Sequence, residues 1–186
     1  MKLKKILVVV ATFALMFTML PETTTAQWSL GASYEIRNED PQNGFGVRLE
    51  REILQKLPLV NLGLRGHFSY FSEDNYVSDN DVTVGDITTY DYGIAATAGI
   101  SLGLVSPYVG TGIGAQTLEV SSTDDSNIFW NGFVGAKVSP IPAIKPFVEY
   151  RFQAADSFDS LTQNANLSDI RDGNTGRLIF GVSLAF

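Results

Sequence analysis

Apolar and polar residues alternate along most of this chain with a period of two. In the C-terminal stretch RLIFGVSLAF, one row consists of Leu178, Phe180, Val182, Leu184 and Phe186, and the residues between them are mostly small or polar. Because successive side chains of a β-strand point to opposite faces, this pattern predicts a strand with one apolar face. Seven earlier stretches alternate in the same way, at residues 28–36, 44–53, 60–71, 88–100, 107–117, 129–138 and 145–153.

The connectors between these predicted strands are of two kinds that also alternate. The short ones are LQKLP, SLGLVSP and SPIPAIKP, and the polar, acidic ones are NEDPQ, SEDNYVSDNDVTVGD, EVSSTDDSN and AADSFDSLTQNANLSDIRDGNTG. Short turns at one end and longer polar loops at the other are typical of a transmembrane β-barrel, and an even strand number returns both termini to the short-turn side. We expect eight strands, or ten if the longest loop holds a further hairpin.

The N-terminus has the layout of a secretory signal peptide. The basic start MKLKK is followed by an apolar run over residues 6–20 and by small residues that end at Ala26. The run is shorter than the roughly 20 residues that a spanning helix needs. We therefore expect residues 1–26 to be a cleaved signal peptide and residues 27–186 to form the barrel. An uncleaved membrane anchor is the alternative interpretation.

The charge balance narrows the range of partners. The whole chain has 13 Lys and Arg against 20 Asp and Glu, and loss of the signal peptide would leave a net charge of −9. Nucleic-acid binding requires a basic face, so an acidic chain argues against it. The chain has no cysteine. The chain can therefore be neither cross-linked by a disulfide nor anchored through a lipid-modified cysteine.

A soluble sandwich or a lipocalin-like barrel is the competing interpretation of the alternation. Such folds bury the apolar row and expose the other row to water. Here the less apolar row is rich in glycine, which strands normally disfavour but which suits a narrow interior packed by a few large side chains. Phe129 and Phe133 break the parity of their stretch. Aromatic residues near the strand ends are expected at the two membrane interfaces, namely Trp28, Tyr70, Phe71, Tyr90, Tyr92, Trp130, Tyr150, Phe152 and Phe186.

The chain resembles the small outer-membrane β-barrels of the OmpA/OmpX type, a group that includes opacity-type surface proteins. The resemblance covers residues 27–186 and rests on the signal-peptide layout, the alternating strands, SPYVGTGIGA and RLIFGVSLAF. It implies an all-β fold, an eight-stranded antiparallel up-and-down transmembrane barrel in a Gram-negative outer membrane, surrounded by lipid and lipopolysaccharide. In that family the terminal strand resembles the signal read by the barrel-assembly machinery, which here would be Phe180, Val182, Leu184 and Phe186.

Charged residues in the inward row are the main candidates for a functional interior. An eight-stranded barrel is just wide enough for side chains to fill, and buried charges must be paired. We expect a salt-bridge network that plugs and stiffens the lumen, with a narrow, gated ion path as the alternative. The residues of this network would be Glu35, Arg48, Glu50, Glu52, Arg65, His67, Asp91, Lys137, Glu149, Arg151 and Arg177.

His67 and Ser69 form the one arrangement in the sequence that suggests catalysis. They lie on the same strand face, and a His–Ser pair can activate a serine nucleophile where a carboxylate orients the imidazole. The spacing resembles that of the outer-membrane lipid A deacylases. A lipid substrate, however, needs access from the bilayer, and the parity points both residues inward. We therefore expect a packed interior histidine and no catalytic residues.

No metal or cofactor site is predicted, because the acidic loop residues match no EF-hand spacing. These residues include Asp79, Asp81, Asp124 and Asp125. Polar loops on a rigid scaffold are a usual place for recognition. We therefore expect a non-enzymatic protein with an envelope-structural or surface-interaction role, in which the acidic extracellular loops contact an extracellular ligand. A narrow porin-like channel and a lipid A-modifying hydrolase are the alternatives.

Overall fold

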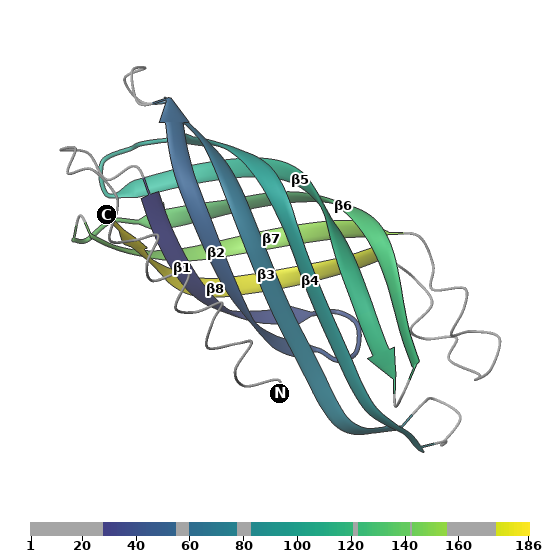
Figure 1. Cartoon of the computed structure of the whole chain (residues 1–186). Helices are drawn as coiled ribbons and strands as arrows, with labels where there is room; N and C mark the ends of the chain where they lie inside the picture. The colour runs from purple at the N-terminus through teal and green to yellow at the C-terminus, as the bar shows by residue number, and fades with distance from the viewer. Residues whose placement is uncertain (1–27, 55–59, 78–82, 121–122, 142, 156–173) are drawn as a thin grey trace.

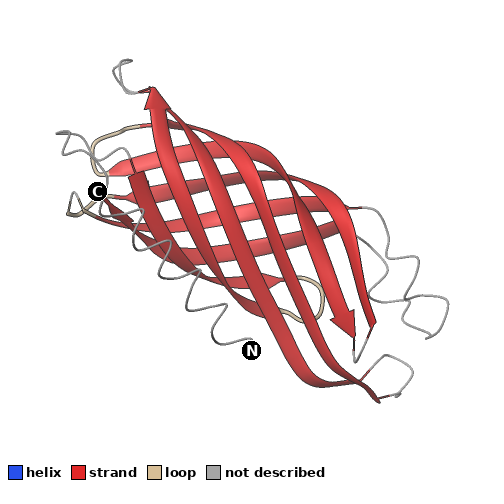
Figure 2. Ribbon diagram, viewed as in Figure 1, coloured by secondary structure: helices blue, strands red, loops and turns tan. Residues whose placement is uncertain are grey.

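The computed structural model describes residues 28–54, 60–77, 83–120, 123–141, 143–155 and 174–186. They form eight strands: β1 (Trp28–Arg37), β2 (Asn43–Leu54), β3 (Val60–Val77), β4 (Thr83–Ile100), β5 (Val105–Val120), β6 (Thr123–Val138), β7 (Ile144–Ala155) and β8 (Asn174–Ala185). Each strand pairs antiparallel with its neighbours in chain order, and β1 also pairs with β8, so the sheet is a closed barrel (Figures 1 and 2). The predicted eight-stranded fold is confirmed. The predicted signal peptide and the longest loop, 156–173, lie outside the described residues.

The terminal strand closes the barrel against the first strand. The N–H of Trp28 donates to the carbonyl of Phe186 at 3.2 Å, and the N–H of Phe186 donates back at 2.9 Å. Further along, Leu30 lies opposite Leu184. Closure leaves neither of these two strands with an unpaired edge. This matters because the hydrocarbon of a membrane cannot form hydrogen bonds with unpaired backbone N–H and C=O groups. The row predicted as the assembly signal, Phe180 to Phe186, lies on the outer surface of this seam.

Apolar side chains face outward and charged ones face inward, which is the reverse of a soluble barrel. Phe45 and Ile94 are 68% and 67% exposed, whereas Arg65 and Glu149 are each 1% exposed. This inversion excludes the soluble interpretation, because no aqueous barrel would bury its ions and expose its apolar row. No helix among the described residues is both long and apolar enough to cross a membrane.

Glycines of the inward row make room for large side chains on the neighbouring strand. Gly110 lies opposite Phe133, and Gly114 lies opposite Phe129, and a Cβ at either glycine would collide with the facing ring. Both rings are therefore inside the barrel, which explains why they break the apolar parity. Phe71 is also inside, at 0% exposure. Its predicted place at a membrane interface is wrong, because it follows the parity of the inward row of β3.

The strands differ in length, and the longer ones extend the barrel at one end. β3 and β4 have 18 residues and β5 and β6 have 16, whereas the other four have 10 to 12. A membrane-spanning strand needs only about 9–11 residues. The four long strands therefore continue past the end opposite the start of β1 and the end of β8 (Figure 1). We call this the extended end. The opposite end, where β1 begins and β8 ends, is the short-turn end.

Two of the predicted acidic loops are largely strand. Ser72 pairs with Thr88 across β3 and β4, and Glu119 pairs with Asp124 across β5 and β6. These extensions could not be predicted from the alternation, because a strand needs an apolar face only where it contacts lipid. Beyond the lipid, the alternation of apolar and polar residues ends, but the hydrogen-bonded pairing of the strands continues.

Candidate functional site

The short-turn half of the interior contains a cluster of ion pairs centred on Glu149, which lies on β7. Its Oε2 atom accepts hydrogen bonds from Arg65 Nη1 at 2.6 Å, Tyr108 Oη at 2.9 Å and Arg48 Nη1 at 3.3 Å. Its Oε1 atom accepts one from Arg151 Nη2 at 2.8 Å. A carboxylate has about four acceptor sites, so this buried charge is fully satisfied.

Glu50 on β2 extends this cluster toward the mouth of the barrel. Its Oε2 atom lies 2.9 Å from Arg65 Nη2, and its Oε1 atom accepts from Lys137 Nζ at 2.5 Å. Arg65 thus bridges the carboxylates of Glu50 and Glu149. We define the short-turn cluster as Arg48, Glu50, Arg65, Tyr108, Lys137, Glu149 and Arg151.

A second cluster lies in the half of the interior nearer the extended end and is centred on Arg177. Arg177 Nη1 lies 2.9 Å from Asp91 Oδ2 and 3.4 Å from Glu35 Oε2. Its Nη2 atom donates to Gln153 Oε1 at 2.8 Å, and Gln153 in turn donates to Gln116 at 2.7 Å. We define the central cluster as Glu35, Ser69, Asp91, Gln116, Gln153 and Arg177.

Aromatic rings fill the space beside the guanidinium groups. Arg48 Cζ lies 3.2 Å from the ring centroid of Phe147, and Arg177 Cζ lies 5.1 Å from that of Phe71. A cation over a ring face is attracted by the ring's quadrupole, most strongly where both are desolvated. Aromatic rings therefore share the bore with the ionic and polar side chains of the two clusters.

His67 lies beside the central cluster without forming a catalytic relay. Its Nε2 atom is 4.0 Å from Asp91 Oδ1, and neither ring nitrogen has a hydrogen-bond partner among the described residues. The Ser69 hydroxyl donates instead to Glu35 Oε1 at 3.1 Å. A nucleophile needs its base within about 3.2 Å, and His67 does not supply that contact.

The structure places most of the predicted interior residues together. Nine are buried inside the barrel, and Lys137 and Glu52 are half-buried near its short-turn mouth. Sequence reasoning did not single out Tyr108, Gln116 and Gln153, which belong to the two clusters, or Arg37, a further buried cation that donates to Thr89. Arg37 has the inward parity of Glu35 but lies one residue beyond the predicted strand. The other three side chains are neutral, and the predicted network was chosen from charged and titratable inward residues.

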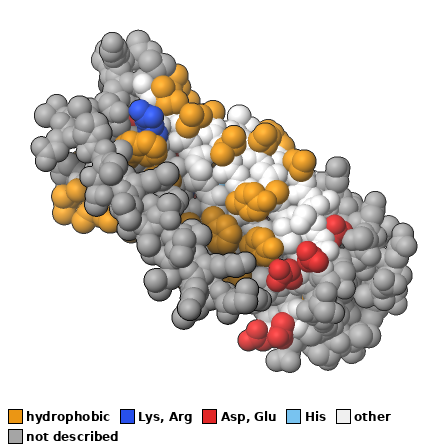
Figure 3. All heavy atoms as spheres, in the orientation of Figure 1, with side chains coloured by type: hydrophobic (Ala, Val, Ile, Leu, Met, Phe, Trp, Pro, Cys, Tyr) orange, Lys and Arg blue, Asp and Glu red, His pale blue; other side chains and the backbone are white. Residues whose placement is uncertain are grey.

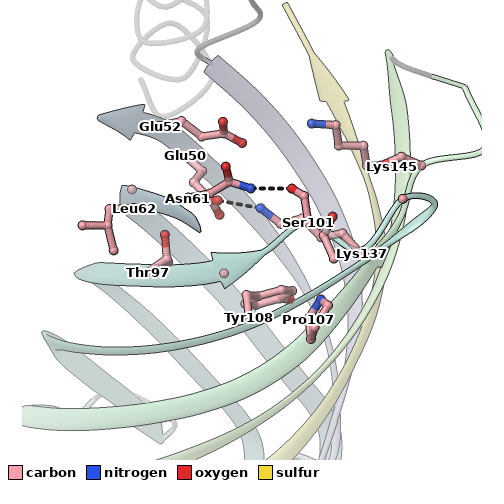
Figure 4. A pocket seen from close by; sticks show the side chains of 15 residues that line it. Glu50, Glu52, Asn61, Leu62, Thr97, Ser101, Pro107, Tyr108, Lys137 and Lys145 are labelled. Carbon is pink, nitrogen blue, oxygen red and sulfur yellow. Dashed lines mark hydrogen bonds and ion pairs between the residues drawn. The ribbon is translucent and has the colours of Figure 1, made fainter. Parts of the chain in front are cut away.

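A polar cavity of about 230 Å³ opens at the short-turn mouth (Figure 4). Glu50, Lys137 and Tyr108 line it on the side of the short-turn cluster, and Glu52 and Lys145 line it from opposite strands. The ion pair between Glu50 and Lys137 therefore faces this cavity. The arrangement is a vestibule that leads onto the ionic filling of the bore.

At the extended end, the outward side chains change from aromatic to polar and acidic within two residues along the strands. Tyr70 and Tyr90 are partners on β3 and β4 and form the outermost aromatic row whose outward side chains the structure describes. Two residues further out, the cross-strand row consists of Ser72, Thr88, Glu119 and Asp124. Figure 3 shows carboxylates gathered at this end of the outer surface. Tyrosine belts mark membrane interfaces, so this row lies just outside the bilayer.

A second cavity, of about 310 Å³, lies between the β1–β2 connection and β3 at the extended end. Asp40, Gln42, Asn43, Ser72 and Glu73 line it. Burial and the nearby Asp40 carboxylate raise the pKa of Glu73 above its ordinary value. Negative charge is therefore dense enough here for carboxylates to repel one another.

Among the described strands and turns, no group of three or more His, Cys, Asp and Glu side chains is arranged to hold a metal ion. Asp124 and Asp125 are consecutive residues of β6, and Asp79 and Asp81 lie outside the described residues.

A closed barrel with an apolar exterior and an ion-paired interior is a membrane-spanning β-barrel. The sequence matches the family described as "Outer membrane protein beta-barrel domain" over residues 6–186, and the chain belongs to that family. It is therefore a protein of the outer membrane. Short turns face the periplasm in such barrels, so the short-turn end is periplasmic and the extended end is extracellular.

Solved structures of similar fold come from several bacteria. Neisserial surface protein A has 16% identity and a TM-score of 0.57, over 86% of this chain and 96% of that one. The attachment invasion locus protein of Yersinia pestis has 18% identity and a TM-score of 0.52, over 86% and 96%. The N-terminal β-barrel domain of Pseudomonas aeruginosa OprF has 12% identity and a TM-score of 0.57, over 87% and 98%. No curated protein matches the chain. Identities this low show the shared fold alone.

Proposed function

We propose that this protein is a non-enzymatic outer-membrane barrel that presents an acidic, four-stranded surface outside the cell for interaction with a partner. The observation that carries the proposal is the continuation of β3 to β6 as paired strands beyond the row of Tyr70 and Tyr90. Exposed carboxylates along this extension are those of Asp74, Asp86, Glu119 and Asp124. We call these four residues the acidic surface.

Rigidity supports a role in recognition. Backbone pairing fixes the spacing of the acidic surface, and the two buried clusters brace the barrel below it. A preorganised surface loses less conformational entropy on binding than a flexible loop does. The same rigidity would also serve a purely structural role in the envelope.

The charge of the surface indicates the chemistry of its partner. The attachment invasion locus protein of Yersinia pestis has been solved in complex with the heparin analogue sucrose octasulfate, a polyanion. An acidic surface repels polyanions and favours a cationic partner, because like charges across an interface cost binding energy. We therefore infer a basic protein or peptide as the extracellular ligand of this chain.

The two alternative functions have weaker support. A channel needs a continuous water path, and the short-turn and central clusters occupy the bore with buried side chains. A lipid A hydrolase needs an activated serine open to lipid, and Ser69 is buried and bonded to Glu35. We further propose that residues 1–26 are removed on export and that the row Phe180, Val182, Leu184 and Phe186 is read by the barrel-assembly machinery.

The proposal is tested with proteoliposomes that carry the refolded protein. Immobilised lysozyme serves as the basic probe and immobilised heparin as the acidic one. Vesicles with the unmodified protein should be retained on lysozyme at low salt, released as salt screens the charges, and not retained on heparin. The variant with Asp74→Asn, Asp86→Asn, Glu119→Gln and Asp124→Asn should lose retention, whereas Glu52→Gln at the periplasmic mouth should keep it. Equal retention of the fourfold variant, or retention on heparin, would refute the proposal.

A further inference from the structure

Three glycines whose surroundings the structure describes lie on the outward row of their strands, and two of them are covered by an aromatic side chain. A Cβ at Gly132 would lie 3.2 Å from the indole ring of Trp130, and one at Gly176 would lie 2.6 Å from the hydroxyl of Tyr150. At Gly66 a Cβ would meet nothing within 4 Å. Gly66 is therefore a bare gap in the lipid-facing surface of β3.

A groove of about 780 Å³ surrounds this gap on the outer face of the barrel. Its walls include Phe68 beside the gap on β3, Tyr92 and Ile94 on β4, and Ile113 on β5. Gly66 pairs with Ile94, and Ile94 pairs with Ile113. Because Gly66 has no side chain, the groove is deeper at this point than along the bulky apolar residues beside it.

The groove lies at a defined depth in the membrane. On β4, the outward residues from Tyr90 to Ile100 cover ten residue steps, which at about 3.3 Å per residue and a tilt of about 40° gives a band about 25 Å tall. Gly66 is four residues from Tyr70 of the extracellular aromatic row. The same arithmetic places it about 10 Å below that row. The groove is therefore in the half of the band that faces the outer leaflet.

We propose that this groove is a binding site for one acyl chain of lipid A, the lipid of the outer leaflet. A water molecule needs two to four polar partners, and the walls named above present apolar surface. The groove is continuous with the lipid-facing surface of the barrel, so hydrocarbon reaches it directly. An acyl chain laid over Gly66 covers the exposed backbone, as Trp130 and Tyr150 cover the other two outward glycines.

The test fills the groove with a side chain. Gly66→Leu occupies open space and should fold normally, which heat-dependent gel mobility checks. Ala98→Leu is the matched control, because Ala98 is an outward small residue of β4 in the periplasmic half of the band. Each protein is reconstituted in nanodiscs that contain lipid A and phosphatidylethanolamine, and native mass spectrometry counts the retained lipids.

We expect one lipid A per barrel for the unmodified protein and for Ala98→Leu, and an affinity lower by about tenfold for Gly66→Leu, since the leucine displaces buried methylene groups. Equal retention of lipid A by Gly66→Leu would overturn the proposal. Retention of phosphatidylethanolamine as strongly as lipid A would overturn the choice of lipid. A dimer that Gly66→Leu dissociates would instead assign the groove to a second copy of the chain.

Discussion

Replacing Glu149 by glutamine should strongly destabilise the barrel. Glu149 is 1% exposed and receives hydrogen bonds from Arg48, Arg65, Tyr108 and Arg151. Glutamine keeps the shape but removes the charge that compensates three buried guanidinium groups. Breaking a buried ion pair by neutralising one partner costs about 3–5 kcal/mol. We expect Glu149→Gln to lower the free energy of unfolding by about that amount, also because its amide group points two donors at other donors.

Urea unfolding in lipid vesicles, followed by tryptophan fluorescence, measures this free energy by linear extrapolation. The matched control is Glu119→Gln, which removes an exposed carboxylate of the extracellular surface and should cost less than about 1 kcal/mol. A double variant with Arg65→Gln should cost less than the sum of the two single changes, because the two residues share one interaction. If Glu149→Gln costs no more than Glu119→Gln, the interior network does not brace the barrel.

Three further changes test other parts of the structure. Gly110→Val should destabilise the barrel by about 1–3 kcal/mol in the same unfolding assay, since it overpacks the space that the Phe133 ring occupies; an unchanged midpoint would contradict this packing. Phe186→Ala should slow assembly in cells, seen as protein of unfolded gel mobility, while refolding in vesicles stays intact. His67→Ala should leave the mass spectrum of lipid A from expressing cells unchanged, and a shift by one acyl chain would restore the hydrolase interpretation.

Much of the fold could be predicted because the membrane imposes a rule on every strand. Lipid requires an apolar outward row. The alternation therefore shows both where each strand lies and which of its residues point into the barrel. That parity is why Glu35, Arg65 and Arg177 could be assigned to the interior from the sequence. Pairing within the interior could not be predicted, because it depends on register and on the tilt of strands around the barrel.

The errors arise where the parity rule was not followed or does not apply. Phe71 ends the predicted strand over residues 60–71, but its parity is inward, and parity decides its position. Phe129 and Phe133 face glycines on β5, a match that only the register reveals. Above the bilayer, β3 to β6 pair without an apolar face, so the segments around Ser72 and Glu119 looked like loops.

Single-channel recording of the refolded protein in a planar bilayer tests the central claim most directly, with folding confirmed by heat-dependent gel mobility. The claim is that ionic and aromatic side chains fill the lumen and make the barrel a scaffold for its extracellular surface. We predict a silent bilayer for the unmodified protein. Discrete and reproducible conductance steps would contradict the account, because they would require a water path through the short-turn and central clusters.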